Sequence, residues 1–393
     1  MALLPIAEAQ ARLLALAGRT PVDRVPLTQA IGRWAAEPVV ARRTQPESDL
    51  SAMDGYAIRF ADLPGPWRVI GESAAGKAFV GAAATGEAVR IFTGAPLPAD
   101  TDTVLVQEEA LRDGEALHLT GEGPAHRGRN TRKRGLDFAE GDVLIAAGER
   151  LTPARIALAA VAGHAELWVH RRVRVAIAAT GDELVPPGAP IGPSQLPESN
   201  RILLAAQLAD LPVDLVDLGI LPDDLDALTA AFAAVEADLL ITSGGASVGD
   251  HDLVRPALEA AGATIDFWRI ALRPGKPMMA GRRGDMVVLG LPGNPVSVFV
   301  TAILFAKPMI AHLAGAAAPF PVPHLVLLGE DLPANGARTD YIRAVLVDGR
   351  AHPAAIQDSS MLRTLARSTC LIVREPHAAA ADAFELVEIL DIA

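Results

Sequence analysis

The sequence contains a single cysteine, Cys370, among its 393 residues. One cysteine cannot form a disulfide within the chain, and it cannot supply the clustered thiolates of a zinc or iron–sulfur site. The segment around it, residues 369–373, is typical of a strand, so we interpret Cys370 as a buried small apolar side chain. These observations favour a reducing compartment, and we expect a cytoplasmic protein.

Long apolar segments are also missing. The longest mostly apolar run covers residues 296–306 and is ended by Lys307 and Pro308. A membrane-spanning helix needs roughly 20 apolar residues, so we predict a core helix here and no membrane partner. Residues 1–5 lack a basic segment followed by an apolar one, so we predict no signal peptide.

Positive charge is scarce, because 35 Lys and Arg face 47 Asp and Glu and the net charge is −12 at pH 7. Such a chain is a poor general binder of nucleic acid or of anionic membranes, and we expect no nucleic-acid partner. Half of the residues are hydrophobic and 21% are charged, which is typical of a packed protein and not of a disordered one. Any anionic substrate must therefore meet a local cluster of cations.

Four domains are expected from the pattern of apolar runs, giving an α/β multidomain fold class. Residues 171–318 alternate strands and helices, which predicts a central parallel sheet covered by helices on both faces. Short strands separated by Gly, Pro and Asp predict a small β-rich domain at 44–134 and a C-terminal β-domain at 319–393. The remaining segments, 1–43 and 135–170, form a discontinuous helical and extended linker domain.

The elements of the central domain can be predicted individually. We expect strands at residues 173–178, 213–218, 238–242, 264–270 and 286–289. Helices are expected at 200–211, 223–235, 252–261 and 296–313. In the N-terminal part, Thr152 and Pro153 are a typical helix start.

Four loops rich in Gly, Pro and charge follow expected strands of this domain. They cover residues 180–184, 243–252, 273–277 and 291–295. Ligands of open α/β sheets bind beyond the carboxyl ends of the strands, so we expect these loops to meet at one edge and form a site.

The second of these loops, residues 243–249, is suited to an anion. Its glycines allow sharp turns that present backbone N–H groups. It lacks the Lys-Ser/Thr ending of a P-loop and the spacing of a dinucleotide-binding turn, and a tight loop without a ligand is the alternative. The residues that we expect to bind are Ser243, Gly244, Gly245, Ser247 and Gly249.

Carboxylates and cations accompany the anion loop. The carboxylates would repel one another unless a cation lies between them, and Mg²⁺ prefers such hard oxygen ligands. They are Asp182, Glu183, Asp223, Asp250 and Asp252, the last also suited to be a helix N-cap.

The cations near the anion loop suit a tetrahedral oxyanion, with solvated surface charge as the alternative. They are Arg269, Arg273 and Lys276.

Two loops outside the central domain also carry polar side chains at tight turns. Asp54 lies in residues 51–57, and Thr93 lies in residues 91–98. Either loop alone is better explained as a structural turn. The histidines are scattered without a His-x-x-x-His pair, so we predict no histidine-based metal site.

Together these segments resemble the MoeA family, which includes the gephyrin E domain. The matches run in the family's order over nearly the whole chain: SAMDGYA at 51–57, IFTGAPLP at 91–98, RGLD at 134–137, TGDEL at 180–184, SGGASVGD at 243–250, RPGKP at 273–277 and GLPGNPVS at 290–297. Some relatives have Lys at the positions of Arg269 and Arg273. His251 is an additional residue without an assigned role, and the C-terminal domain matches mainly through residues 339–343.

The resemblance implies a molybdopterin molybdenumtransferase, which transfers molybdenum from molybdate onto adenylylated molybdopterin and releases AMP with the assistance of Mg²⁺. It also implies an elongated homodimer of four-domain subunits whose central domain is MogA-like. The dithiolene sulfurs of the substrate hold the metal, in agreement with a chain that has no cysteine pair. Transient contacts with the molybdopterin adenylyltransferase and with cofactor-accepting enzymes are expected.

The family's functional residues can be carried over by position. The implied catalytic residues are Asp54, Thr93, Asp137, Glu183, Asp223 and Asp252, of which Glu183, Asp223 and Asp252 are the expected Mg²⁺ ligands. The implied substrate-binding residues, besides those of the anion loop, are Arg269, Arg273, Lys276, Pro292, Pro295 and Ser297. In the family's dimer, the cleft lies where the central domain faces the β-rich domain of the partner, which would bring Asp54 and Thr93 near the anion loops.

We therefore hypothesise that the pterin phosphate lies on residues 243–249 and that molybdate lies between Arg269, Arg273 and residues 292–297. One alternative is ATP-dependent adenylylation of molybdopterin, an activity that resembles the central domain alone; the additional domains argue against it. The other is a non-catalytic scaffold or cofactor carrier, for which the sequence offers no long linker or binding tail.

Overall fold

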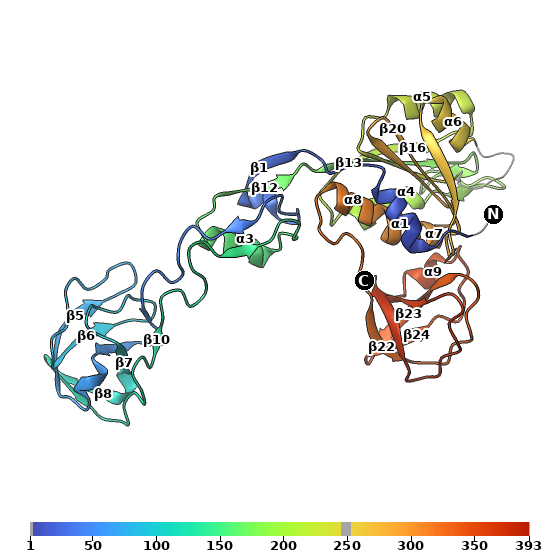
Figure 1. The fold of residues 1–393 in the computed structure, drawn as a ribbon. Helices are drawn as coiled ribbons and strands as arrows, with labels where there is room; N and C mark the ends of the chain where they lie inside the picture. Colours follow the sequence, from blue (N-terminus) through green and yellow to red (C-terminus); the bar gives the residue numbers. More distant parts are fainter. Residues whose placement is uncertain (1–2, 245–252, 393) are drawn as a thin grey trace. The chain divides into compact units, whose positions relative to one another are not determined.

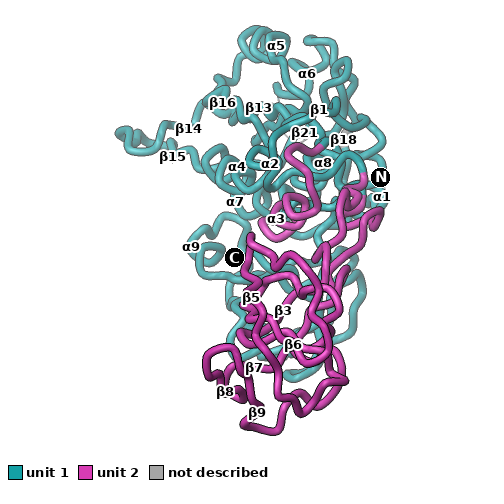
Figure 2. Tube along the Cα trace, turned by 90° about the vertical axis from the view of Figure 1, so that its left-hand side faces the viewer, with its two compact units in different colours: residues 1–37, 147–152, 168–393 teal, residues 38–146, 153–167 magenta. Residues whose placement is uncertain are grey.

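The computed structural model describes residues 3–244 and 253–392, which form two compact units (Figures 1 and 2). The first unit consists of Met1–Glu37, Ala147–Thr152 and Trp168–Ala393, and the second of Pro38–Ala146 and Pro153–Leu167. The division into four domains stays a prediction.

The second unit is built around a six-stranded sheet with the order β7-β4-β6-β5-β9-β8. Its strands are β4 Gly55–Ile58, β5 Trp67–Ser73, β6 Glu87–Ile91, β7 Thr103–Val106, β8 Ala110–Asp113 and β9 Ala116–Leu119. Apolar side chains from one face, including Ile58, Trp67, Leu105 and Leu117, form its core. The unit also contains β2 Val39–Val40, β3 Leu50–Ser51, η1 Phe60–Asp62, η2 Gln107–Glu109, β10 Thr131–Arg132, β11 Val143–Ile145 and α3 Pro153–Val161. The predicted β-rich character of this region is confirmed.

The first unit contains a six-stranded sheet with the order β16-β13-β17-β21-β20-β18. Its strands are β13 Val173–Thr180, β16 Val213–Leu221, β17 Leu239–Ser243, β18 Thr264–Arg269, β20 Pro277–Arg283 and β21 Met286–Leu291. Around it lie α1 Ile6–Leu14, α4 Asn200–Leu208, α5 Leu225–Ala234, α6 Val254–Ala260, α7 Pro295–Thr301, the π-helical turn Ala302–Ala306 and α8 Lys307–Leu313. Shorter elements are β1 Val22–Pro26, α2 Leu27–Ala30, β14 Leu184–Val185 and β15 Leu196–Pro197, together with β12 Glu166–His170, whose first two residues belong to the second unit.

Apolar residues alternate between the two faces of this sheet. Ile177, Ile241 and Leu289 pack with α1, α4, α7 and α8 on one face. Leu240 and Val288 pack with α5 and α6 on the other face. Because both faces are covered, the central strands are almost continuously apolar, as the sequence analysis predicted.

The expectation of a purely parallel sheet is wrong at one strand. β16, β13, β17 and β21 are parallel, but β20 is antiparallel to both β21 and β18. The sequence prediction missed β20 because this segment begins with Pro277 and contains Gly281, two residues that are unfavourable in strands. β18 still runs parallel to β21, so its carboxyl end reaches the same edge of the sheet.

The predicted core helix after β21 is confirmed. Residues Pro295–Leu313 are long and apolar enough to span a membrane, but 78% of the apolar window is buried inside the fold. This helix therefore supplies much of the packing beneath the sheet, including Val298, Phe305 and Met309.

The C-terminal part of the first unit is a small β-barrel. Its strands follow the order β19-β23-β24-β22-β26-β25, and an additional pairing of β23 with β25 closes it. The elements are β19 Leu272–Arg273, β22 His324–Leu328, β23 Thr339–Val347, β24 Arg350–Pro353, α9 Leu362–Leu365, β25 Cys370–Arg374 and β26 Leu386–Asp391. Cys370 is fully buried in its core, as predicted, and burial raises the pKa of its thiol to about 11.

Replacing Gly281 with alanine tests the packing of the antiparallel strand. A Cβ atom at this position would lie 2.1 Å from the carbonyl oxygen of Thr264 and 2.7 Å from Cδ1 of Ile265. Overpacking of this kind costs about 1–3 kcal/mol, so we expect a lower free energy of unfolding by that amount in urea denaturation. Gly18→Ala is the control, because nothing lies within 4 Å of its added Cβ. If the urea midpoints of Gly281→Ala and the wild type are equal, β18 and β20 can move apart at this position without a loss of stability.

Candidate functional site

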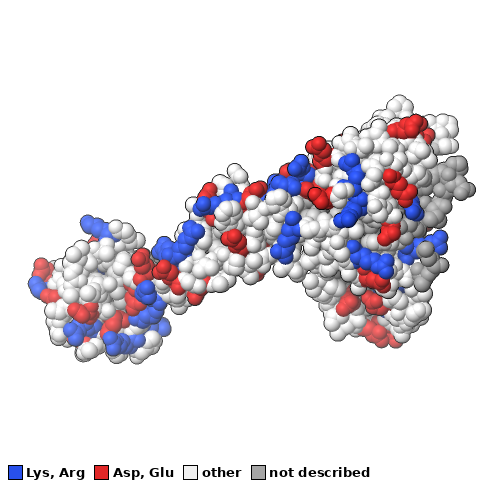
Figure 3. All heavy atoms as spheres, turned by 45° about the horizontal axis from the view of Figure 1, so that its top comes forward, with Lys and Arg blue, Asp and Glu red and all other residues white. Residues whose placement is uncertain are grey.

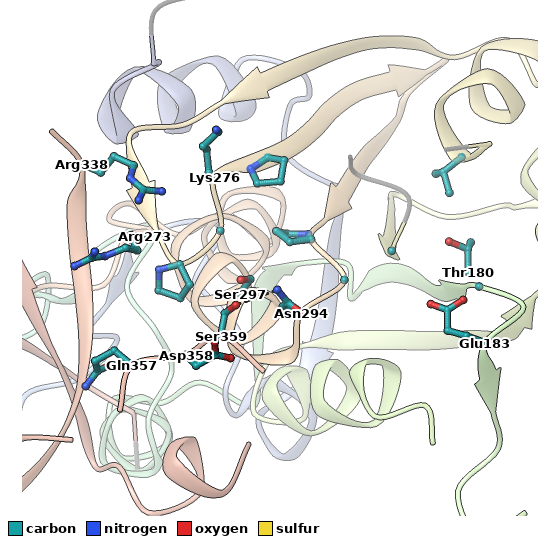
Figure 4. A pocket seen from close by; sticks show the side chains of 18 of the residues that line it. Thr180, Glu183, Arg273, Lys276, Asn294, Ser297, Arg338, Gln357, Asp358 and Ser359 are labelled. Carbon is teal, nitrogen blue, oxygen red and sulfur yellow. Dashed lines mark hydrogen bonds between the residues drawn. The ribbon is translucent and has the colours of Figure 1, made fainter. Parts of the chain in front are cut away.

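A cavity of about 660 Å³ opens at the carboxyl ends of the parallel strands, beside the C-terminal barrel (Figure 4). All four predicted loops reach it. Thr180 ends β13, Gly181 and Glu183 follow it, and Gly244 follows β17. The turn between β19 and β20 contributes Arg273–Pro277, and the loop after β21 contributes Pro292, Gly293 and Asn294, with Ser297 beyond it. The prediction that these loops meet at one edge is confirmed for the described residues.

Close packing of the loops depends on two glycines. Gly244 has a φ of +92°, and a Cβ there would lie 2.7 Å from the carbonyl oxygen of Thr180. Gly275 has a φ of +113°, and a Cβ there would lie 2.7 Å from Cγ2 of Thr301. Larger residues would therefore be strained and would also push the loops apart.

Some predicted residues do not line the described cavity. Arg269 ends β18 opposite Pro277 and is partly buried. Ser243 is buried at the end of β17, and its hydroxyl has no hydrogen-bond partner among the described residues. Pro295 is the first residue of α7. Four more predicted positions, Gly245, Ser247, Gly249 and Asp252, lie outside the described residues, as does His251.

The acidic side of the cavity contains Glu183 and Asp223. Burial raises the pKa of the Asp223 carboxyl, and the negative charges of Asp182 and Glu183 add to this effect, against an opposing hydrogen bond with the Asp182 backbone. Among the described residues, no three His, Cys, Asp or Glu side chains form a complete metal-binding group. A cation here would therefore take further ligands from the substrate, from water or from outside the described ranges.

The opposite side of the cavity is cationic. Arg273, Lys276 and Arg338 line it, and Figure 4 shows them across the cavity from Thr180 and Glu183. Arg273 forms an ion pair with Asp340, whereas Lys276 and Arg338 have no ion-pair partner within the described parts of the chain. On the face drawn in Figure 3, basic and acidic side chains are interspersed, so a local cluster such as this one is needed to hold anions.

The C-terminal barrel supplies lining residues that the sequence analysis missed. Besides Arg338, these are Gln357, Asp358 and Ser359. Ser359 connects the barrel to the loop after β21, because its Oγ accepts a 2.9 Å bond from Asn294 Nδ2 and its carbonyl oxygen accepts a 3.1 Å bond from Val296 N–H. Arg338 directly precedes the matching segment 339–343, so the sequence could have indicated it. The short polar stretch 357–360 resembles an ordinary turn, and nothing in its sequence predicts a place in the cavity.

A buried arginine shapes this polar stretch. Arg343 is 1% exposed, and burial lowers the pKa of its guanidinium. Its Nε donates to Gln357 Oε1 at 3.2 Å, and its Nη1 donates to the carbonyl oxygen of Met361 at 3.3 Å. Asp358 accepts hydrogen bonds from the backbone and hydroxyl of Ser360, which lower its pKa. The loop is thus held in shape from inside the barrel.

The two predicted residues of the second unit lie together. Asp54 Oδ1 accepts a 2.7 Å bond from Thr93 N–H and a 2.8 Å bond from Thr93 Oγ1. The backbone bond first, and then the hydroxyl bond, lower the pKa of Asp54. Arg90 adds to this shift and stacks on Phe92 at 4.7 Å. Asp54 is therefore held as a carboxylate.

Asp137 belongs to a different loop of the second unit. Its side chain is exposed, and its backbone N–H donates to the carbonyl oxygen of Gln45 at 3.0 Å. The structure thus brings Asp54 and Thr93 together and places Asp137 on a separate loop. The roles predicted for all three residues stay predictions.

Comparisons with known proteins cover the whole chain. The MoeA N-terminal region (domain I and II) matches residues 4–163, a probable molybdopterin binding domain matches residues 176–312, and the MoeA C-terminal region (domain IV) matches residues 326–392. The crystal structure of a molybdopterin biosynthesis moeA protein from Pyrococcus horikoshii OT3 is similar, with a TM-score of 0.84 and 27% identity over 100% of both chains.

Curated relatives agree with these matches. A protein of Haemophilus influenzae named molybdopterin molybdenumtransferase is 36% identical over 380 residues, 94% of each chain. A protein of the same name from Bacillus subtilis is 32% identical over 94% of this chain and 90% of the relative. The chain therefore belongs to the MoeA family of molybdopterin molybdenumtransferases, which act in molybdenum cofactor biosynthesis.

Proposed function

We propose that the cavity of the first unit holds molybdate at its cationic side and the phosphate of adenylylated molybdopterin beside it, so that molybdenum transfer releases AMP. The observation that carries this proposal is the cluster of Arg273, Lys276 and Arg338 on one wall of the cavity in a chain of net charge −12. Two anions brought together repel each other, and fixed cations offset that repulsion.

Hydrogen-bonding groups beside the cations suit a tetrahedral oxyanion. Ser297 and Ser359 line the same cavity, and the side chain of Asn294 holds the Ser359 hydroxyl in place. Guanidinium groups supply parallel N–H donors to two oxygens of one anion. Molybdate would therefore be oriented as well as attracted.

Glu183 and Asp223 fit the Mg²⁺ that the family implies. Burial raises the pKa of Asp223, and the negative charges of Asp182 and Glu183 add to this effect, so a cation bound here would favour its charged form. Carboxylate oxygens are the ligands that Mg²⁺ prefers, and it usually shares them with substrate phosphates. The two residues would hold the ion, whose bound form supplies Lewis-acid polarisation of a phosphoanhydride. Asp252 is the third proposed ligand.

We also propose that Asp54 acts as a carboxylate acceptor near the substrates, in the groove between subunits that the family resemblance implies. Its two bonds from Thr93 keep it deprotonated and fix its direction. This role requires the predicted homodimer. The cytoplasmic location and the transient contacts with other enzymes of the pathway stay predictions.

Removing the cation on the barrel side tests the oxyanion site. Arg338→Gln should lower kcat/KM for molybdate about 10- to 100-fold, because a bond to a charged group contributes about 1.5–3 kcal/mol. The measurement is AMP release from adenylylated molybdopterin at varied molybdate. Arg367→Gln, an exposed arginine of the same barrel, is the control. An unchanged kcat/KM for Arg338→Gln would place the oxyanion elsewhere.

Removing the charge of Asp223 should stabilise the protein while it weakens Mg²⁺ binding. A carboxyl whose folded pKa is raised binds its proton more tightly when folded, so its charged form costs stability as the pH rises through that pKa. Asp223→Asn should therefore melt at a slightly higher temperature at pH 7 without Mg²⁺, and the gain should vanish below about pH 4.

Thermal melting with and without Mg²⁺ measures both effects. Mg²⁺ should raise the melting temperature of the wild type more than that of Asp223→Asn. The control is Asp266→Asn, which removes one exposed carboxylate of the same sheet. If Mg²⁺ stabilises Asp223→Asn and the wild type equally, Asp223 is not a ligand.

The hydroxyl of Thr93 can be removed without its backbone donor. Thr93→Val should raise the pKa of Asp54 and move the acidic limb of the pH–activity profile to higher pH, with roughly tenfold lower activity at low pH. Thr101→Val is the matched control, because the Thr101 hydroxyl donates to the Pro98 carbonyl oxygen and, among the described residues, to no carboxylate. If the acidic limb of the pH–activity profile is the same in Thr93→Val and the wild type, Asp54 does not act as a carboxylate in the reaction.

A further inference from the structure

The short strand β19 carries a cation of the cavity into the sheet of the C-terminal barrel. It pairs in parallel with β23, so that Leu272 lies opposite Thr339 and Arg273 lies opposite Asp340. The Thr339 N–H donates to the carbonyl oxygen of Ala271 at 2.9 Å. Side chains at paired positions of neighbouring strands are close neighbours. Backbone pairing therefore fixes the register that brings Asp340 to Arg273.

The two partners are buried to very different degrees. The side chain of Asp340 is 5% exposed and that of Arg273 is 59% exposed. A buried carboxylate is costly unless it is paired, and Arg273 is its ion-pair partner among the described residues. Asp340 is thus a rigid, buried anchor, whereas the guanidinium that it holds remains open to solvent.

The ion pair uses only part of the guanidinium. Nη2 of Arg273 donates to Asp340 Oδ2, while its Nε and Nη1 have no partner among the described residues. Arg273 lines the 660 Å³ cavity and also a neighbouring cavity of about 330 Å³ that Asp340 and Gln357 border. In Figure 4 its side chain extends toward the barrel. Nη2 of the guanidinium is therefore held by Asp340, and the N–H groups of Nε and Nη1 remain able to donate to an anion.

We propose that Asp340 is a positioning residue for molybdenum transfer, which orients Arg273 at the oxyanion site from within the C-terminal barrel. Ordering a free arginine side chain costs conformational entropy, and the ion pair already orders Arg273 during folding instead of during substrate binding. The negative charge of Asp340 reduces the attraction of this site for an anion. The contribution of Asp340 is therefore to fix the orientation of the Arg273 guanidinium. The inference rests on the proposed oxyanion site at Arg273.

A double-mutant cycle separates positioning from a general structural role. Asp340→Asn should lower kcat/KM for molybdate about tenfold in the wild type, and less than twofold in an Arg273→Met background. Asp340→Glu, which keeps the charge, should recover at least a third of the lost activity. The control is Asp382→Asn, an exposed carboxylate of the same barrel. Circular dichroism verifies that each variant is folded.

Each remaining outcome has a definite meaning. If Asp340→Asn lowers kcat/KM equally with and without Arg273, Asp340 has only a structural role. If Asp340→Asn raises kcat/KM, the main effect of Asp340 is to repel the anion. Either result overturns the inference. Wild-type activity of Arg273→Met would instead overturn the oxyanion site itself. If Asp340→Asn does not fold, Asp340→Glu enters the same cycle, with a smaller loss that again requires Arg273.

Discussion

The cationic wall of the cavity depends on three positively charged side chains that the fold holds close together in an acidic chain. Arg273, Lys276 and Arg338 come from two different parts of the first unit, a turn of the α/β sheet and the start of a barrel strand. Like charges would separate if their backbones were free. They stay together because β19 and β23 share backbone hydrogen bonds and because Ser359 is bonded to the loop after β21.

The two sides of the cavity present opposite electrostatic problems. One side carries Arg273, Lys276 and Arg338, and on the other side burial, together with the negative charges of Asp182 and Glu183, raises the pKa of Asp223. Under the proposed function, an oxyanion on the first side and a divalent cation on the second would balance these charges. Such strain is common where a protein is organised for its substrates and not for its own stability. In the second unit, by contrast, Thr93 lowers the pKa of Asp54 and holds it charged without any ligand.

Much of the central domain could be predicted from local pattern. The strands at 173–178 and 238–242 and the helix at 296–313 follow from continuous apolar runs between turn residues, and all three are present with small shifts of boundary. The strand β20 could not be predicted in this way, because Pro277 and Gly281 weaken its local signal. Its formation depends on the neighbouring backbone of Thr264, which approaches so closely that only glycine fits.

The sequence by itself determined the family, the α/β character of the sheet and the loops of the cavity, because each is encoded in short segments of consecutive residues. Only the tertiary structure decided that the C-terminal barrel lines the same cavity. Residues 338, 340 and 357–359 are far from 273 in the chain, and no local periodicity records which strand pairs with β19. That pairing depends on backbone hydrogen bonds and on a buried carboxylate that needs a cation, which are properties of the folded chain alone.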